Sequence, residues 1–331
     1  MIQFTPSNLT IKLKWTKRKF VQLFAIFLGG LVSFFLLSSI PSVANTPTTK
    51  IEFVSPDWVS QHINNPKVKV LDVRINPLEY IDGHIPKAVN LADNVFRGPN
   101  GFLPVQYWDA DKIVQLLSKS GVSNNDQVVV YSDGNNVLGA TMVAYLLERS
   151  GAKEVAIVDG GYKGFKDAKE TVTKEFPRYT PGRFTLQDNP DIRVSIEQLK
   201  PLIGKPGTVI IDPRPADLFE GKVNLWVRNG HIPGAKNIPW PTFTEANNPD
   251  EALKNPHKLK SLDEIKQLLA ERNIKPDDNI IVSCSTGREA TLQYIVLKHL
   301  LGYPNVRIYE GSWTEYSTTD LPVETGPERS A

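Results

Sequence analysis

One residue of this chain stands out for its chemistry: Cys284, the only cysteine among 331 residues. It follows a short apolar run at 280–282 that predicts a buried strand, and from Ala290 the apolar spacing becomes helical. A thiol held where loop N–H groups and a helix N-terminus converge ionises more easily than a free thiol. Such surroundings lower a thiol pKa from about 8.5 to roughly 3.5–7.5. We therefore expect Cys284 to be a nucleophile near neutral pH.

The composition limits what else the chain can be. Its length suits about two domains, each with its own core. Charge is nearly balanced, with 38 Lys+Arg against 36 Asp+Glu, which argues against nucleic acid as a partner. A single cysteine excludes intrachain disulfides and a cysteine-rich zinc site, and the five histidines lack metal-type spacing. We predict no metal site and no cofactor.

The N-terminal residues 1–44 have the pattern of an export signal. Basic residues at 12–19 precede an uncharged, largely apolar run from Phe20 to Ile40, and small residues follow at Ser42 and Ala44. This predicts cleavage after Ala44 and a periplasmic or other extracytoplasmic location. The run is also about long enough to cross a bilayer, so an uncleaved membrane anchor is the alternative. An unpaired thiol in an exported protein favours a functional role for that thiol.

The rest of the chain contains a tandem repeat. Val54–Arg74 aligns without a gap with Val194–Arg214, which places Asp72 opposite Asp212. Three further matches follow in the same order: Gly83–Leu91 with Gly230–Ile238, Asp126–Ser132 with Asp278–Cys284, and Val155–Tyr162 with Val306–Trp313. We conclude that the chain carries two copies of one domain, at 50–168 and 193–316, joined by a linker at 169–192 and followed by a tail at 317–331.

Strands and helices alternate within each copy, which predicts an α/β fold with a mostly parallel sheet flanked by helices. Capped helices are expected to begin at Ser55 and Ser195. The further elements expected are strands at 69–73 and 209–211 and helices at 110–120 and 261–271.

The two copies differ where chemistry is expected. Ser132, followed by Asp133, occupies the place of Cys284, and two extra residues precede the pair at 140–141 that matches Ala290-Thr291. A longer loop headed by serine supplies no thiolate. The first copy is therefore predicted to be a non-catalytic scaffold, and the second to carry the reaction.

The motifs resemble the tandem form of the rhodanese family of sulfurtransferases. The motifs that carry the resemblance are Asp-x-Arg at Asp212–Arg214, GHIPGA at Gly230–Ala235, CSTGRE from Cys284 and YEGSWTEY at Tyr309–Tyr316. The resemblance spans about 54–316 and implies that Cys284 accepts a sulfur from a donor such as thiosulfate, holds it as a persulfide, and passes it to cyanide or a thiol. It also implies a first domain without the cysteine, as here. We expect the protein to act as a monomer.

Sulfane-sulfur donors are small anions, so the site needs cations and N–H donors. Arg288 lies in the cysteine loop and Arg214 at the end of a strand, where sites of α/β proteins collect. Both are predicted to bind the donor, and a guanidinium can hold its oxygens in a forked contact. The amides of Ser285, Thr286 and Gly287, together with that of Arg288, are predicted to stabilise the anionic sulfur.

Several of these residues also have a structural interpretation. Arg214 could tether the loop through Asp212 instead of binding substrate, because Arg74 recurs in the copy without the thiol. Asp212 is expected to be a loop anchor, His231 to serve the GHIP turn, and Trp313 to pack under the site. Glu289 adds a negative charge close to where an anion should dock.

The loop also departs from the patterns of the family. Members that prefer thiosulfate carry a basic residue one or two positions after the cysteine, where Ser285 and Thr286 lie here, and mercaptopyruvate users carry a Cys-Gly-Ser-Gly loop. A cysteine phosphatase needs a longer loop, with its arginine six positions after the cysteine rather than four, and arsenate reduction is disfavoured by a similar comparison. A non-catalytic module that senses sulfur or binds a partner is the alternative of another class.

Overall fold

The computed structural model describes residues 49–134, 136–245 and 258–328. The predicted signal or anchor at 1–44, with the run Phe20 to Ile40, lies outside these residues. Within the described ranges, no helix is long and apolar enough to span a bilayer.

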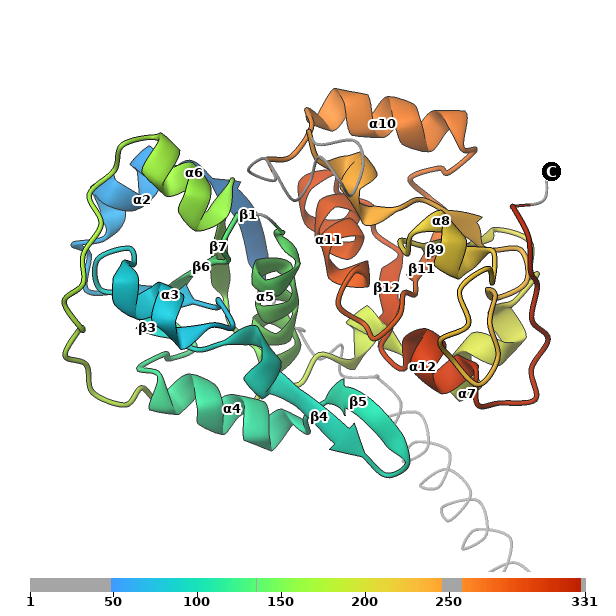
Figure 1. Ribbon diagram of the computed structural model, residues 1–331, viewed down its shortest axis with the longest axis horizontal. Helices are drawn as coiled ribbons and strands as arrows, with labels where there is room; N and C mark the ends of the chain where they lie inside the picture. The colour runs from blue at the N-terminus through green and yellow to red at the C-terminus, as the bar shows by residue number, and fades with distance from the viewer. Residues whose placement is uncertain (1–48, 135, 246–257, 329–331) are drawn as a thin grey trace, which may run out of the picture. The chain divides into compact units, whose positions relative to one another are not determined.

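The first copy of the repeat forms a five-stranded parallel sheet with the strand order β1-β7-β6-β2-β3 (Figure 1). Its strands are β1 (Lys50–Val54), β2 (Val68–Asp72), β3 (Val89–Asn90), β6 (Gln127–Tyr131) and β7 (Glu154–Val158). Its helices are α2 (Pro56–His62), α3 (Pro77–Asp82), α4 (Ala110–Lys119), α5 (Leu138–Ser150) and α6 (Gly161–Asp167). Val128 and Val130 of β6 pack on the face that α4 and α5 cover, and Val129 and Tyr131 pack on the opposite face. Helices therefore cover both faces, as predicted.

The second copy repeats this arrangement with the strand order β10-β9-β11-β12-β8, again parallel throughout. Its strands are β8 (Arg193–Val194), β9 (Thr208–Asp212), β10 (Lys236–Asn237), β11 (Asn279–Val282) and β12 (Val306–Tyr309). Its helices are α7 (Ile196–Leu199), α8 (Ala216–Phe219), α10 (Leu262–Glu271), α11 (Ala290–Ile295) with a π-helical continuation at Val296–Leu300, and α12 (Ser312–Tyr316). β11 pairs with β9 on one side and β12 on the other, so the segment that leads to Cys284 is the central strand.

Serine caps begin helices at the positions that the sequence predicts. Ser55 Oγ accepts a hydrogen bond from the Trp58 N–H, and Pro56 occupies the first turn of α2. Ser195 and Ser261 each form a capping box with the residue three positions on. These predictions are confirmed to within one residue.

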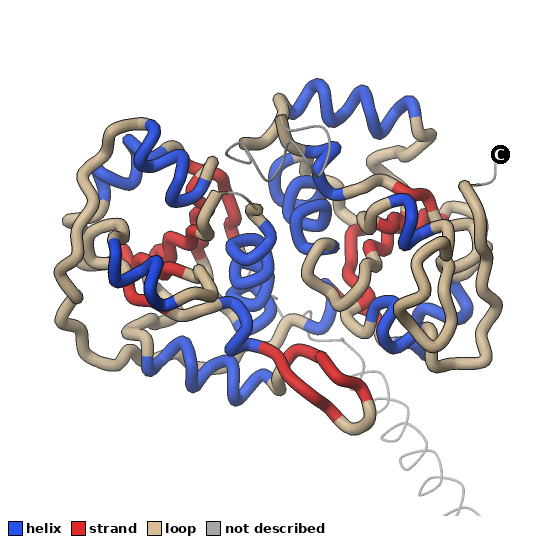
Figure 2. Tube along the Cα trace, in the orientation of Figure 1, coloured by secondary structure: helices blue, strands red, loops and turns tan. Residues whose placement is uncertain are grey.

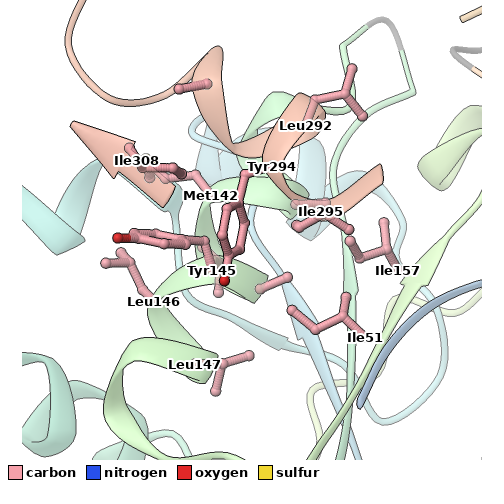
Figure 3. Close-up of a cluster of buried hydrophobic side chains, with 14 of the residues drawn as sticks. Ile51, Met142, Tyr145, Leu146, Leu147, Ile157, Leu292, Tyr294, Ile295 and Ile308 are labelled. Carbon is pink, nitrogen blue, oxygen red and sulfur yellow. The ribbon is translucent and has the colours of Figure 1, made fainter. Parts of the chain in front are cut away.

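The two copies share one hydrophobic core. Helices α5 and α11 pack against each other, and the aligned threonines Thr141 and Thr291 meet with a distance of 2.8 Å between their hydroxyl oxygens. Beside them Tyr145 and Tyr294 lie edge to face with ring centroids 5.3 Å apart (Figure 3). Buried residues of both copies form this cluster, so the expectation of separate cores holds only for the outer faces of the two sheets.

Three segments lie outside the repeated elements. An antiparallel hairpin of β4 (Arg97–Asn100) and β5 (Leu103–Tyr107) projects from the first copy (Figure 1). Most of the linker is loop, as Figure 2 shows, with one bridge between Thr173 and His84. The predicted tail returns to the second copy, because the Glu324 and His231 backbones exchange hydrogen bonds of 3.0 and 2.9 Å. The described part of the tail is therefore packed against the second copy.

Candidate active site

Cys284 lies at the carboxyl end of β11, two residues after the strand ends. Its carbonyl accepts a 2.9 Å hydrogen bond from the Trp313 N–H, and its N–H lies 3.4 Å from Ser312 Oγ. The turn after β12 therefore fixes the head of the cysteine loop. The thiol is fully buried in this conformation and belongs to the shared core.

The electrostatic surroundings of the sulfur differ from the prediction. Burial and the nearby Glu289 carboxylate raise the pKa of the Cys284 thiol well above its ordinary value, whereas hydrogen bonds from the backbone N–H groups of Ala290 and Thr286 lower it. Burial dominates, so the expected lowering of the pKa is wrong for this conformation. The predicted backbone donors are present in part, but no arginine offsets the loss of water.

Residues of the first copy cover the cysteine loop. Arg97 at the start of β4 donates a 3.1 Å hydrogen bond to Thr286 Oγ1, and the Tyr107 hydroxyl at the end of β5 donates one of 2.8 Å to the Gly287 carbonyl. Gly287 has a φ of +84°, and a Cβ there would lie 3.1 Å from the Tyr107 hydroxyl. Glycine is therefore required both by the turn and by the close cover. Thr314 holds the carbonyl of Ser285 from the other side through its N–H and its hydroxyl.

Arg288 points to the first copy. Its Nη2 forms an ion pair of 2.6 Å with Asp93 Oδ2, and both residues line a cavity of about 180 Å³ at the carboxyl edge of the first sheet. Ser132, the counterpart of Cys284, also lines this cavity, and Cys284 is not among its lining residues. Arg288 is therefore part of the cysteine loop, as predicted, but in this conformation its ion pair with Asp93 directs it away from the sulfur.

Arg214 is fully buried and bound to its own strand. Its Nε and Nη2 donate to the Asp212 carboxylate, with a shortest distance of 2.6 Å, and Nη2 also donates to the Gly230 carbonyl at 2.8 Å. Arg74 makes the same contacts with Asp72 and Gly83 in the copy without the thiol. The recurrence favours the tethering alternative for Arg214 over contact with the donor.

The remaining predicted residues support the loop from below. The Trp313 ring lies under the Arg214 guanidinium, 4.9 Å from it, and Trp313 Nε1 donates to the Arg228 carbonyl at 3.0 Å. His231 stacks on Phe219 at 3.6 Å and its Nδ1 lies 2.8 Å from the Phe219 carbonyl. Burial lowers the pKa of His231, so it is neutral at pH 7 and suits the structural role predicted for the GHIP turn.

Sequence reasoning missed the first-copy residues Asp93, Arg97 and Tyr107, and it missed Ser312. The first three lie in or beside a hairpin outside the repeat matches, so no motif marked them. Ser312 had a signal in the sequence, because it lies within a repeat match and aligns with Gly161. In the structure both residues have positive φ, at +52° and +58°. In the described ranges no group of three or more His, Cys, Asp or Glu side chains is arranged to hold a metal ion.

The chain matches known proteins over most of its length. The Rhodanese-like domain model matches residues 55–168 and 195–319. A relative from Synechococcus elongatus, named as a candidate thiosulfate sulfurtransferase, is 62% identical over 87% of this chain and 89% of its own length. The 3-mercaptopyruvate sulfurtransferase of Escherichia coli is 30% identical over 82% of this chain and 97% of its own.

Solved structures agree with the sequence matches. The crystal structure of the 3-mercaptopyruvate sulfurtransferase SseA from Escherichia coli superimposes with a TM-score of 0.70 and 28% identity, covering 80% of this chain and 99% of that one. The fold, the order of the motifs and both domain matches lead to one assignment. The chain belongs to the rhodanese family of sulfurtransferases and carries the rhodanese domain in two tandem copies.

Proposed function

We propose that this protein transfers a sulfane sulfur from a small anionic donor such as thiosulfate, through a persulfide on Cys284, to cyanide or a thiol. One observation carries the proposal: the only thiol of the chain lies at the carboxyl edge of the second sheet with the N–H groups of Thr286 and Ala290 at its sulfur. The aligned residue of the first copy, Ser132, has no sulfur to carry. The transfer is therefore assigned to the second copy alone.

The persulfide divides the transfer into two displacements. In each, a sulfur anion forms or leaves, and backbone N–H groups that are already in place stabilise it. Both amides lower the pKa of Cys284, which is the effect expected of donors that stabilise the anion. The names of the relatives, which include thiosulfate and 3-mercaptopyruvate sulfurtransferases, support a small anionic donor.

Donor entry requires the cover to move, because Cys284 is fully buried. We infer that the described conformation is a closed state and that loading begins when the contacts of Arg97 and Tyr107 with the loop release. Release of Arg288 from Asp93 would then supply the predicted cation for the donor. We place the reaction outside the cytoplasm on the strength of the signal pattern at 1–44.

A sulfur-carrying or sulfur-sensing protein without turnover is the second candidate. The buried thiol with its raised pKa favours it, since a closed site suits storage better than rapid exchange. A relative from Thermus thermophilus, 33% identical over 83% of this chain and 97% of its own length, is named sulfur carrier protein TtuD.

Two measurements separate these candidates. The protein is mixed with thiosulfate, and mass spectrometry follows the addition of one sulfur atom to Cys284; cyanide is then added and thiocyanate is measured. A sulfurtransferase loads and turns over, Cys284→Ser abolishes both steps, and the matched first-copy variant Ser132→Ala leaves both unchanged. Loading without thiocyanate supports the carrier. An unmodified thiol after treatment with several donors refutes both.

A further inference from the structure

The buried thiol needs a proton acceptor. Its pKa is raised, so Cys284 is protonated at neutral pH, and a protonated thiol is a poor nucleophile. In the closed conformation neither predicted cation is placed to ionise it, because Arg288 pairs with Asp93 and Arg214 pairs with Asp212, and an Arg288 released on opening is assigned to the oxygens of the donor. Attack on a donor therefore requires a base next to the sulfur.

Glu289 is beside the sulfur and has no structural task. Its carboxylate lies close enough to the thiol to raise the Cys284 pKa, both through its charge and as a hydrogen-bonding partner. Glu289 holds the N-cap position of α11, yet its side chain makes no capping hydrogen bond. Within the described residues it takes part in no ion pair, and its buried Oε2 has no hydrogen-bond partner. A carboxylate that neither caps nor pairs is available for proton transfer.

The repeat associates this carboxylate with the cysteine. Ala290 aligns with Ala140, so the counterpart of Glu289 is Gly139. A Cβ at position 139 would lie 2.6 Å from Asp93 Oδ2, which leaves no room for a side chain. The copy that has serine in place of the thiol therefore also lacks the carboxylate.

Two hydroxyl groups near the sulfur already donate to backbone carbonyls. Ser312 Oγ lies 3.9 Å from Sγ but donates its proton to the Tyr309 carbonyl at 3.0 Å. The Tyr107 hydroxyl donates to Gly287, and burial raises its pKa well above the ordinary value. Charged groups on neighbouring elements also have partners. Arg97 from β4 contacts Thr286, and Asp93 beside β4 contacts Arg288. Glu310 after β12 accepts from Tyr145 and pairs with Arg149 of α5 at 3.5 Å.

We propose that Glu289 is a catalytic residue of the sulfur transfer, the general base that takes the proton of the Cys284 thiol. The inference rests on the proposed function. As the S–H bond breaks, the proton moves to the carboxylate; the Sγ electron pair forms a bond to the sulfane sulfur of thiosulfate, whose own S–S bond breaks with its electron pair leaving on sulfite. Cyanide then takes the outer sulfur as thiocyanate, and neutral Glu289 returns the proton to the Cys284 thiolate. Atoms and charge balance without an external oxidant or reductant.

Proton transfer moves the single negative charge of the pair from the Glu289 carboxylate to the Cys284 sulfur. The charge then lies on the atom that forms the new bond, where the N–H groups of Thr286 and Ala290 stabilise it.

The test is the pH profile of single-turnover loading with thiosulfate, read as sulfite release and as added sulfur on Cys284. We expect Glu289→Gln to load about 10²- to 10⁴-fold more slowly than wild type at neutral pH, the usual contribution of a positioned base. Wild type should show a plateau around neutral pH, whereas the variant should depend on hydroxide throughout. Glu289→Asp should restore part of the rate, and Glu271→Gln, an exposed change on α10, should behave as wild type.

An increase in the loading rate of Glu289→Gln overturns the proposal. If Glu289 acts only as a negative charge that opposes the thiolate, Glu289→Gln lowers the Cys284 pKa and loading becomes faster. Alkylation of Cys284 by iodoacetamide over the same pH range separates this proposal from the proposed function. If wild type fails to load any donor, the sulfurtransferase proposal fails. A plateau in the alkylation rate around neutral pH that Glu289→Gln abolishes still identifies Glu289 as the base. If the alkylation rates of wild type and Glu289→Gln depend on pH in the same way, Glu289 is not the base. Unfolding transitions show whether each variant folds.

Discussion

The cover over the cysteine loop can be weakened by removing one oxygen atom. Tyr107→Phe deletes the 2.8 Å hydrogen bond to the Gly287 carbonyl and keeps the ring in the shared core. Because water replaces the tyrosine hydroxyl when the loop opens, the loss falls mainly on the closed state. A neutral hydrogen bond contributes about 0.5–1.5 kcal/mol. With a factor of ten for each 1.4 kcal/mol, opening should become about 2- to 12-fold more frequent.

Alkylation of Cys284 measures this opening directly, because the chain has no other cysteine. When reclosing is faster than the chemical step, the rate with iodoacetamide is proportional to the open population. Tyr80→Phe is the matched control, since the Tyr80 hydroxyl donates an equally short 2.8 Å bond to the Ala88 carbonyl, away from the loop. A Tyr107→Phe rate equal to those of wild type and Tyr80→Phe would show that this bond does not control access to the sulfur.

Two further predictions concern the arginines. Asp93→Asn removes the ion-pair partner of Arg288. If Arg288 binds the donor once released, the KM for thiosulfate should fall about threefold to tenfold, which corresponds to about 0.7–1.4 kcal/mol. An unchanged or raised KM in steady-state kinetics would exclude Arg288 from donor binding. Asp212→Asn and Asp72→Asn each leave a buried guanidinium without its carboxylate, so each should lower the free energy of unfolding by about 3–5 kcal/mol in denaturant titrations. If Arg214 only tethers the loop after its strand, neither variant should change the KM of the folded enzyme. A raised KM in Asp212→Asn alone would restore Arg214 as a donor ligand.

Local patterns and the internal repeat were sufficient to predict the fold. Capping serines such as Ser55 and Ser261 act within one turn of helix, so their effect can be read from neighbouring residues. The continuous apolar runs in β6 and β11, each after one polar residue, are typical of strands covered on both faces. The repeat then supplied what one copy alone could not, the comparison between Ser132 and Cys284.

The surroundings of the sulfur could not be predicted in the same way, because they depend on contacts between residues far apart in sequence. The lowered pKa was inferred from local amides, and these are present, but burial outweighs them, and the core that encloses the sulfur includes residues of both copies. Arg288 was placed correctly in the loop, whereas its direction is set by Asp93, a residue 195 positions away. No periodicity or motif in either segment records that pairing.

The first copy has no thiol at the position of Cys284, and its residues cover the cysteine loop of the second copy. Gly139, where the second copy has Glu289, leaves space for Asp93 to reach Arg288, and Tyr107 closes over Gly287. These contacts and the shared core between α5 and α11 bury a thiol that the second copy alone would leave less covered. A buried thiol of raised pKa resists stray alkylation and oxidation, because both reactions need an accessible thiolate. For the exported protein that the signal pattern at 1–44 predicts, such protection would give the domain without a nucleophile a role.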